Sequence, residues 1–156
     1  MTNKYTLINS RSPVLFYLLL FFNTLLSCSS NKENKQRFIS EEQLKIQVVT
    51  QDSINAHKLG ELKKFGVDEK SGISIDFFFV TDDSSKAINL TTELIALNYH
   101  LNNIHPSSGN QNLWVASGSS SRVNMELQSL NAWTDSLCNT GFRHDCAFNG
   151  WNPVTE

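Results

Sequence analysis

The chain has 156 residues and carries 13 lysines and arginines against 15 aspartates and glutamates, which gives a formal net charge of −2. A mildly acidic chain without a run of basic residues lacks the positive surface of nucleic-acid-binding proteins, so we expect no nucleic-acid partner. The length allows one compact domain with a hydrophobic core, and no internal repeat indicates a second domain.

The first 27 residues have the layout of a secretory signal peptide. Lys4 and Arg11 make the segment positive, and no acidic residue precedes Glu33. The apolar stretch Val14–Leu26 has only thirteen residues, whereas a membrane-spanning helix needs roughly 20. Without Lys4 and Arg11 the remaining chain has 11 basic and 15 acidic residues, a net charge near −4.

The apolar stretch ends in Leu25-Leu26-Ser27-Cys28, which resembles the lipobox of bacterial lipoproteins. This resemblance implies cleavage before Cys28, diacylglycerol on its sulfur and usually a further acyl chain such as palmitate. Several acyl chains give stable anchoring where one does not. Ser29 in place of Asp favours delivery to the outer membrane over retention at the inner one. The alternatives are an uncleaved short anchor, or an ordinary signal peptide with a chance cysteine.

These features predict three parts: a signal peptide over residues 1–27, a lipidated polar tether over 28–38, and a domain over 39–156. The tether has no apolar residue between Cys28 and Arg37, which is typical of a solvated linker. We therefore expect the domain in the cell envelope, facing the periplasm or the cell surface.

Assigning Cys28 to lipid leaves Cys138 and Cys146 as an even pair in an oxidising compartment, which predicts a disulfide. Two alternatives remain open. His144 and Asp145 could join the cysteines in a metal site, although the spacing matches no familiar pattern of four ligands. A catalytic thiol would need a base that is adjacent in space rather than in sequence. We predict no metal and no cofactor.

The first element of the domain is a helix. Ser40 and Gln43 have the spacing of a capping box, and the strongest helical pattern runs over Ser53–Phe65 before Gly66 ends it. From Gly72 a strand follows, with alternating apolar residues on both of its faces towards its end, which is typical of a central strand. The alternation covers Ile73, Ile75, Phe77 and Phe79 on one face, and Phe78 and Val80 on the other.

A second helix begins at Asp82 or Asp83 and runs to about Asn98. Its apolar stripe is predicted to pack into the core and comprises Ala87, Leu90, Leu94 and Leu97, widened by Ile88 and Ile95.

Strands over Tyr99–Ile104 and Leu113–Ala116 form a predicted hairpin, and Gly118–Ser121 reads as a polar loop. A third helix over Arg122–Asn139 and a short strand within Phe142–Trp151 complete the chain. The order is a helix followed by β-α-β-β-α-β. This is an α+β, ferredoxin-like sandwich with an extra N-terminal helix.

Three segments resemble the family of regulators of ribonuclease E activity B (RraB). They are the helix end Leu59–Asp68, the helix Asp83–Asn98 that runs into Tyr99–Leu101, and the closing Phe148-Asn149-Gly150-Trp151, which is similar to that family's Tyr-Asp-Gly-Trp. The resemblance implies a ferredoxin-like domain that inhibits ribonuclease E in the cytoplasm by protein contact, without chemistry of its own.

The sequence departs from that family. Phe148 and Asn149 replace Tyr and Asp, the long acidic tail of the enterobacterial type does not follow Trp151, and the signal peptide predicts export away from ribonuclease E. A shared fold does not by itself transfer a target. The pair Gly150-Trp151 has two readings: a structural one, in which the indole covers an open edge of the core, and a surface anchor for a partner.

The leading hypothesis is a lipid-anchored, non-enzymatic module that binds or inhibits an unknown protein of the envelope. One form of it is an immunity-type lipoprotein that neutralises a toxin at the membrane. A second hypothesis keeps ribonuclease E as the target and requires a non-functional signal. A third is an envelope enzyme or ligand binder whose polar groups converge on one pocket, and its candidates are His100, His105, His144 and Asp145.

Overall fold

The structure is a computed structural model that describes residues 36–70 and 72–154. The predicted signal peptide and the lipidation site at Cys28 lie outside these residues. Within them, no helix is both long enough and apolar enough to cross a membrane.

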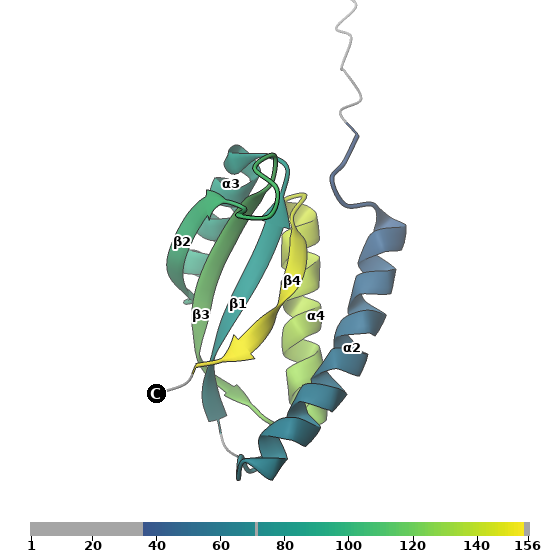
Figure 1. Ribbon diagram of the computed structural model, residues 1–156, viewed down its shortest axis with the longest axis vertical. Helices are drawn as coiled ribbons and strands as arrows, with labels where there is room; N and C mark the ends of the chain where they lie inside the picture. The colour runs from purple at the N-terminus through teal and green to yellow at the C-terminus, as the bar shows by residue number, and fades with distance from the viewer. Residues whose placement is uncertain (1–35, 71, 155–156) are drawn as a thin grey trace, which may run out of the picture. The chain divides into compact units, whose positions relative to one another are not determined.

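Three helices and four strands make up the described domain, in the predicted order of a helix followed by β-α-β-β-α-β (Figure 1). The strands form one antiparallel sheet in the order β2-β3-β1-β4, which confirms the ferredoxin-like fold. The elements are α2 (Glu41–Lys64), β1 (Gly72–Thr81), α3 (Ser84–Ala96), β2 (His100–Pro106), β3 (Trp114–Asn124), α4 (Leu127–Arg143) and β4 (Ala147–Pro153).

The described helices leave one face of the sheet open. α3 and α4 lie behind the sheet in Figure 1, and α2 packs beside α4 next to β4. β2 forms the opposite edge of the sheet, with α3 behind it. The layers therefore follow one another as helices, then sheet, then solvent.

α2 is one continuous helix with the predicted capping box. The backbone N–H of Gln43 donates to Ser40 Oγ over 3.2 Å, and the Ser40 N–H donates to Gln43 Oε1 over 2.7 Å. The helix ends before Gly66, whose φ of 85° is a conformation that glycine adopts without strain. Both predicted ends of this helix are confirmed.

α3 begins at Asp83, whose carboxylate accepts a hydrogen bond from the Ser85 N–H over 2.8 Å. The predicted stripe is only partly correct. Three of its members are fully buried, namely Ala87, Leu90 and Leu94. The other three are exposed, with exposed fractions of 54% for Ile88, 60% for Ile95 and 49% for Leu97. Because α3 packs against the sheet with one side only, it buries a narrower face than the six apolar residues span.

The third strand is longer than its sequence pattern predicts. β3 runs straight through Gly118–Ser121, which the serine-rich composition had predicted as a loop. Gly118 is required there, because a Cβ at this position would lie 2.6 Å from the His100 carbonyl oxygen and against the Phe77 ring. Small residues let neighbouring strands and a bulky core ring approach at this point.

As a consequence, the last helix begins later than predicted. α4 starts at Leu127 rather than Arg122, and Val123 packs into the core from β3 instead of from the helix. Leu127 itself is 40% exposed. A final strand, predicted within Phe142–Trp151, is present as β4, which runs two residues further to Pro153.

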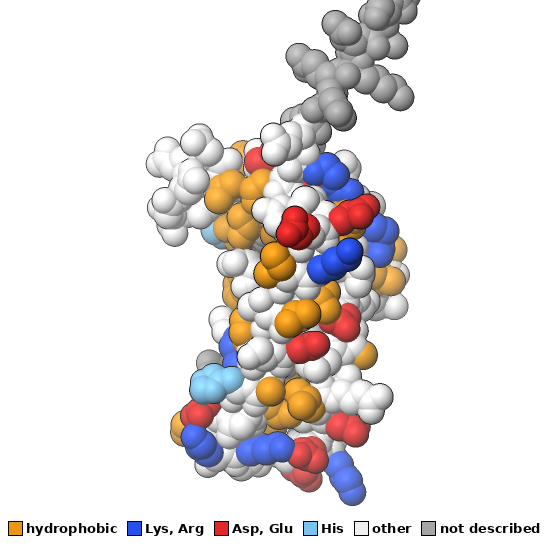
Figure 2. Space-filling view, turned by 90° about the vertical axis from the view of Figure 1, so that its right-hand side faces the viewer, with side chains coloured by type: hydrophobic (Ala, Val, Ile, Leu, Met, Phe, Trp, Pro, Cys, Tyr) orange, Lys and Arg blue, Asp and Glu red, His pale blue; other side chains and the backbone are white. Residues whose placement is uncertain are grey.

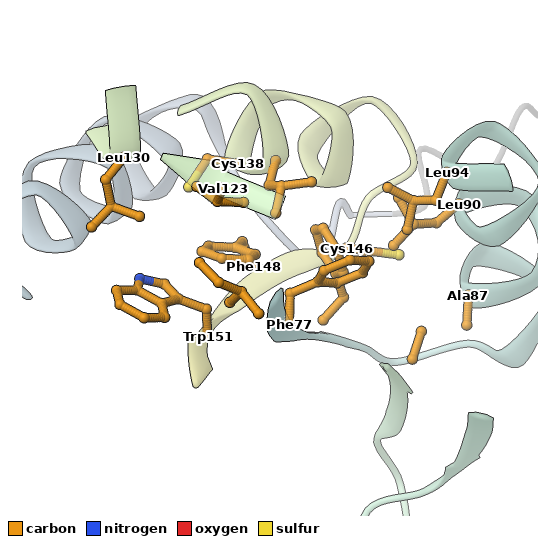
Figure 3. Packing of buried hydrophobic residues seen from close by; sticks show 14 of the residues in the cluster. Phe77, Ala87, Leu90, Leu94, Val123, Leu130, Cys138, Cys146, Phe148 and Trp151 are labelled. Atoms are coloured by element: carbon orange, nitrogen blue, oxygen red, sulfur yellow. The ribbon is translucent and has the colours of Figure 1, made fainter. Parts of the chain in front are cut away.

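Aromatic side chains fill the core between sheet and helices, where Figure 3 places Phe77, Phe148 and Trp151 with Leu130. The rings of Phe79 and Phe148 meet edge to face with centroids 5.3 Å apart. This geometry suits the charge distribution of aromatic rings.

The predicted disulfide is not formed: Cys138 and Cys146 are both buried, free thiols. Burial, together with the nearby carboxylates of Asp135 and Asp52, raises the pKa of Cys138 to about 12. Burial raises the pKa of Cys146 to about 11. Each cysteine acts as a small apolar residue in its own part of the core, a role that cysteine spacing alone does not reveal.

Candidate protein-binding surface

The open face of the sheet is the candidate binding surface, and strand register decides which side chains lie on it. Residues that alternate with the buried Phe77 and Phe79 point to this face. Cross-strand neighbours then form three rows: Val115, Val80 and Ala147; Ser117, Phe78 and Gly150; Ser119, Asp76 and Asn152. The surface thus has an apolar end and a polar end.

At the apolar end, Phe78, Val80 and Val115 are each only partly buried, because none of the described helices covers them. At the polar end lies a shallow groove of about 420 Å³, in which Asp76 is the one charged residue. Its lining is Ser74, Asp76, Asn98, His100, Asn102, Ser119, Ser120, Ser121 and Val154. Protein-binding surfaces likewise combine an apolar region with adjoining polar residues.

The closing motif lies beside this surface but belongs mostly to the core. Phe148 and Trp151 are each 1% exposed, and Gly150 is buried with a φ of 109° at an irregularity of the β1–β4 pairing. Only Asn149 presents a side chain to solvent. The burial of Trp151 supports the structural interpretation of this motif.

Trp151 is held by a buried polar network that the sequence analysis missed. Its indole Nε1–H donates to Asn55 Oδ1 over 2.8 Å. The Asn55 amide in turn donates to Thr134 Oγ1 over 2.8 Å and to Asn131 Oδ1 over 3.0 Å. Asn55 is fully buried and connects α2, α4 and β4. No sequence pattern separates this asparagine from a solvent-exposed one.

α2 also covers the outer edge of β4. The Gln47 amide donates to the Phe148 carbonyl over 2.7 Å, and the Lys58 ammonium donates to the Trp151 carbonyl. The same ammonium lies 4.7 Å from the centroid of the Trp151 ring, and its burial lowers the pKa of Lys58. Side chains of α2 thus satisfy acceptors that a free edge strand would leave open.

A cluster of charges fixes the start of the domain to the end of α4. Asp145 accepts hydrogen bonds from the backbone N–H groups of Phe38 and Ile39 over 3.0 and 3.1 Å. Lys86 lies 2.6 Å from Asp145 and 2.6 Å from Asp82. The segment before α2 is therefore held by one carboxylate.

Burial alone would raise the pKa of Asp145, but the hydrogen bonds from Lys86, Phe38 and Ile39 outweigh it and lower the pKa to about 2. For Lys86, burial opposes the charged form, and the hydrogen bonds to Asp145 and Asp82 more than compensate, so its pKa is raised. This cluster is therefore a group of ion pairs that stabilises the fold.

The polar residues proposed for an enzyme or ligand site do not converge. His144 bonds to Glu93, and Asp145 belongs to the cluster around Lys86. His100 lines the groove on the open face, while the His105 ring bonds to the neighbouring Pro106 carbonyl. Across residues 36–70 and 72–154, no group of three or more His, Cys, Asp or Glu side chains could hold a metal ion.

Comparison with protein families matches residues 52–152 to RraB, regulator of ribonuclease activity B. The chain belongs to the RraB family. The match begins within α2 and ends one residue after Trp151, so it includes Asn55, the sheet except Pro153 and the closing motif. The RraB family comprises ribonuclease regulators that are not themselves catalytic. A search of the curated proteins found no match to this chain.

Proposed function

We propose that this RraB-family protein is a lipoprotein, anchored through Cys28, whose domain regulates a protein of the cell envelope by binding it without chemistry of its own. The match to a family of non-catalytic regulators over residues 52–152 is the observation that carries the binding role. The sequence Leu25–Cys28 supports the anchor.

The binding surface in this proposal is the open face of the sheet. Its apolar end is formed by Phe78, Val80 and Val115, and its polar end by Asp76 and its serine neighbours. A partner would cover the apolar side chains and pair with the polar rim, as in protein interfaces of ordinary composition. Because α2 closes the edge of β4, the face ends on that side at Asn149 and Asn152.

The anchor would keep this surface close to the membrane. The charge cluster fixes the domain from Arg37 onward, since Asp145 holds both Phe38 and Ile39. In this proposal residues 28–36 form the spacer, and nine extended residues reach at most about 30 Å. A partner within that distance of a lipid surface fits the proposal.

The anchor is tested by replacing Cys28→Ala and following the protein by membrane fractionation and palmitate labelling. Wild type should be labelled and membrane-bound, and Cys28→Ala should lose both properties. Ser29→Ala keeps the cysteine and serves as the matched control. If wild type, Cys28→Ala and Ser29→Ala were all unlabelled and all found in the soluble fraction, the lipoprotein part of the proposal would be overturned.

The binding face is tested with a photoreactive amino acid placed at single positions of the full chain in membranes. Ser117 lies in the middle of the open face, and the exposed Ser53 lies on α2. We expect a cross-link to another protein from Ser117 and none from Ser53, and we expect Val80→Lys to abolish it. Cross-links from Ser53 alone, or no protein adduct from Ser117, would contradict this assignment.

The family match also supports a second candidate, regulation of a ribonuclease as in the cytoplasmic relatives. It requires the chain to stay in the cytoplasm. Inhibition of purified ribonuclease E by the full chain, together with a cytoplasmic location of wild type, would favour this function over the envelope role.

A further inference from the structure

The two edges of the sheet differ. β4 is covered by Gln47 and Lys58 from α2, whereas β2 lies at the opposite edge, away from α2 (Figure 1). Exposed edge strands are usually blunted by charged residues because free N–H and C=O groups invite pairing with another chain. The strand His100–Pro106 contains no Lys, Arg, Asp or Glu, and the features that protect its edge are an irregularity between Leu101 and Asn103 and the terminal Pro106.

β2 is self-complementary in sequence. His100-Leu101-Asn102-Asn103-Ile104-His105 reads the same in both directions except for the exchange of Leu and Ile. Leu101 and Ile104 both pack partly against the core, and both histidines are exposed. In an antiparallel pair of two such strands, each residue would lie opposite its own kind. This is the property that a two-fold interface requires.

The exposed apolar residues of α3 lie over the same edge. Lys86 and Glu93 point from α3 towards the end of α4, as their ion pairs show. Ile88 and Ile95 lie on the opposite flank of the helix by its 3.6-residue period, and α3 packs on β2. They are 54% and 60% exposed. Nothing in the described domain covers this flank.

We propose that a second copy of this chain pairs with β2 about a two-fold axis perpendicular to the sheet. The two four-stranded sheets then form one continuous antiparallel sheet. The two α3 helices pack antiparallel, with Ile88 of one copy against Ile95 of the other and Thr92 near the axis. The open faces of both copies remain free, side by side.

Charge supports a second copy as the occupant. The domain is acidic overall, with a net charge near −4 for the chain after Cys28, so two copies repel each other across most surfaces. The meeting surface would consist of uncharged residues: β2, Ile88, Thr92 and Ile95. Figure 2 shows that the α2 side carries interspersed Asp, Glu, Lys and Arg side chains instead.

A matched pair of variants tests this interface. Ile95 on α3 and Ile46 on α2 are both 60% exposed. The full chain in detergent micelles is examined by sedimentation and by circular dichroism. Wild type and Ile46→Lys should be dimeric. Ile95→Lys should keep the fold and raise the dimer dissociation constant by at least about tenfold, because a buried lysine would lack a partner.

Cysteine cross-linking identifies the axis. Thr92→Cys should form a disulfide-linked dimer on mild oxidation, and Ser53→Cys on the exposed face of α2 should not. A monomeric wild type, equal effects of the two lysine variants, or cross-linking from Ser53→Cys instead of Thr92→Cys would overturn the proposal. A monomer that adds an extended peptide of another protein to β2 would overturn it as well.

Discussion

Asn55 is the residue on which three elements depend. Its side chain accepts from Trp151 and donates to Thr134 and Asn131, so every hydrogen-bonding atom of the amide has a partner. A fully satisfied buried network specifies one packing arrangement, whereas a partly satisfied one is costly. The fixed position of Trp151 beneath the open face therefore depends on a helix almost one hundred residues earlier.

We expect Asn55→Ala to lower the free energy of unfolding by about 3 kcal/mol, because it leaves the Trp151 indole N–H unpaired and opens a cavity. Asn149→Ala, at the solvent-exposed position of the same motif, should cost less than about 0.5 kcal/mol. Urea unfolding of both variants measures the difference. Similar losses for the two would show that the network does not hold Trp151.

Asp145 gives the fold a predictable dependence on pH. Its pKa falls from the usual 3.8 to about 2 on folding, so the folded state favours the charged carboxylate. This contribution is fully present above pH 4 and is lost as the pH falls from about 4 to about 2. The side chain is 17% exposed, so solvent screens it little.

Asp145→Asn should therefore destabilise the protein by about 2 kcal/mol at pH 7. The difference from wild type should shrink as the pH falls from about 4 to about 2. Denaturant unfolding at several pH values measures both effects, with the exposed Glu42→Gln as control. A constant difference between wild type and Asp145→Asn down to pH 2 would rule out this linkage.

At the scale of elements, the contact between α2 and α4 is unusually polar. Asp52 and Asp135 approach each other there, and Oδ1 of each is buried without a hydrogen-bond partner in the part of the chain that the structure describes. Burial, and to a lesser extent Asp52, raise the pKa of Asp135. α2 is held by the Asn55 network and the β4 edge, and this acid pair opposes that attachment.

Asp135→Asn should consequently stabilise the protein at pH 7 by roughly 1 kcal/mol, because it removes a partly buried charge that Asp52 repels. A raised pKa means that the wild-type penalty is relieved when Asp135 binds a proton. The advantage of the variant should therefore diminish as the pH is lowered. Thermal unfolding measures it, and a variant less stable than wild type at pH 7 would contradict this account.

At the scale of the whole molecule, the two core thiols report on global unfolding. Cys138 and Cys146 are fully buried, and their raised pKa values disfavour the reactive thiolate. Both should stay unreactive towards a thiol reagent in the native protein and react only as fast as the domain unfolds. Prompt reaction of either thiol under native conditions would show that the core opens locally.

The number of free cysteine thiols that react in denaturant shows whether Cys28 carries lipid and whether Cys138 and Cys146 form a disulfide. Of three cysteines, two should titrate if Cys28 carries lipid and three if it does not. A protein with a Cys138–Cys146 disulfide would give none or one. Intact-mass measurement after alkylation without reductant separates these cases.

The sequence by itself determined the order of the elements, both ends of α2, the start of α3 and the family. These features depend on local chemistry: capping side chains, a glycine at positive φ, and alternation along β1. Each of these features is determined by contiguous residues and needs no distant partner. The family resemblance rested likewise on short contiguous motifs.

Only the tertiary structure decided the rest, because the rest depends on distant partners. The serines of β3 form a strand since β1 and β2 flank them, although their composition is typical of a loop. Ile88 and Ile95 stay exposed because α3 lies at the edge of the sheet, not because their pattern is less apolar than that of Leu90. The pairing of Asn55 with Trp151 and the burial of two free cysteines arise from packing between elements, which no local pattern encodes.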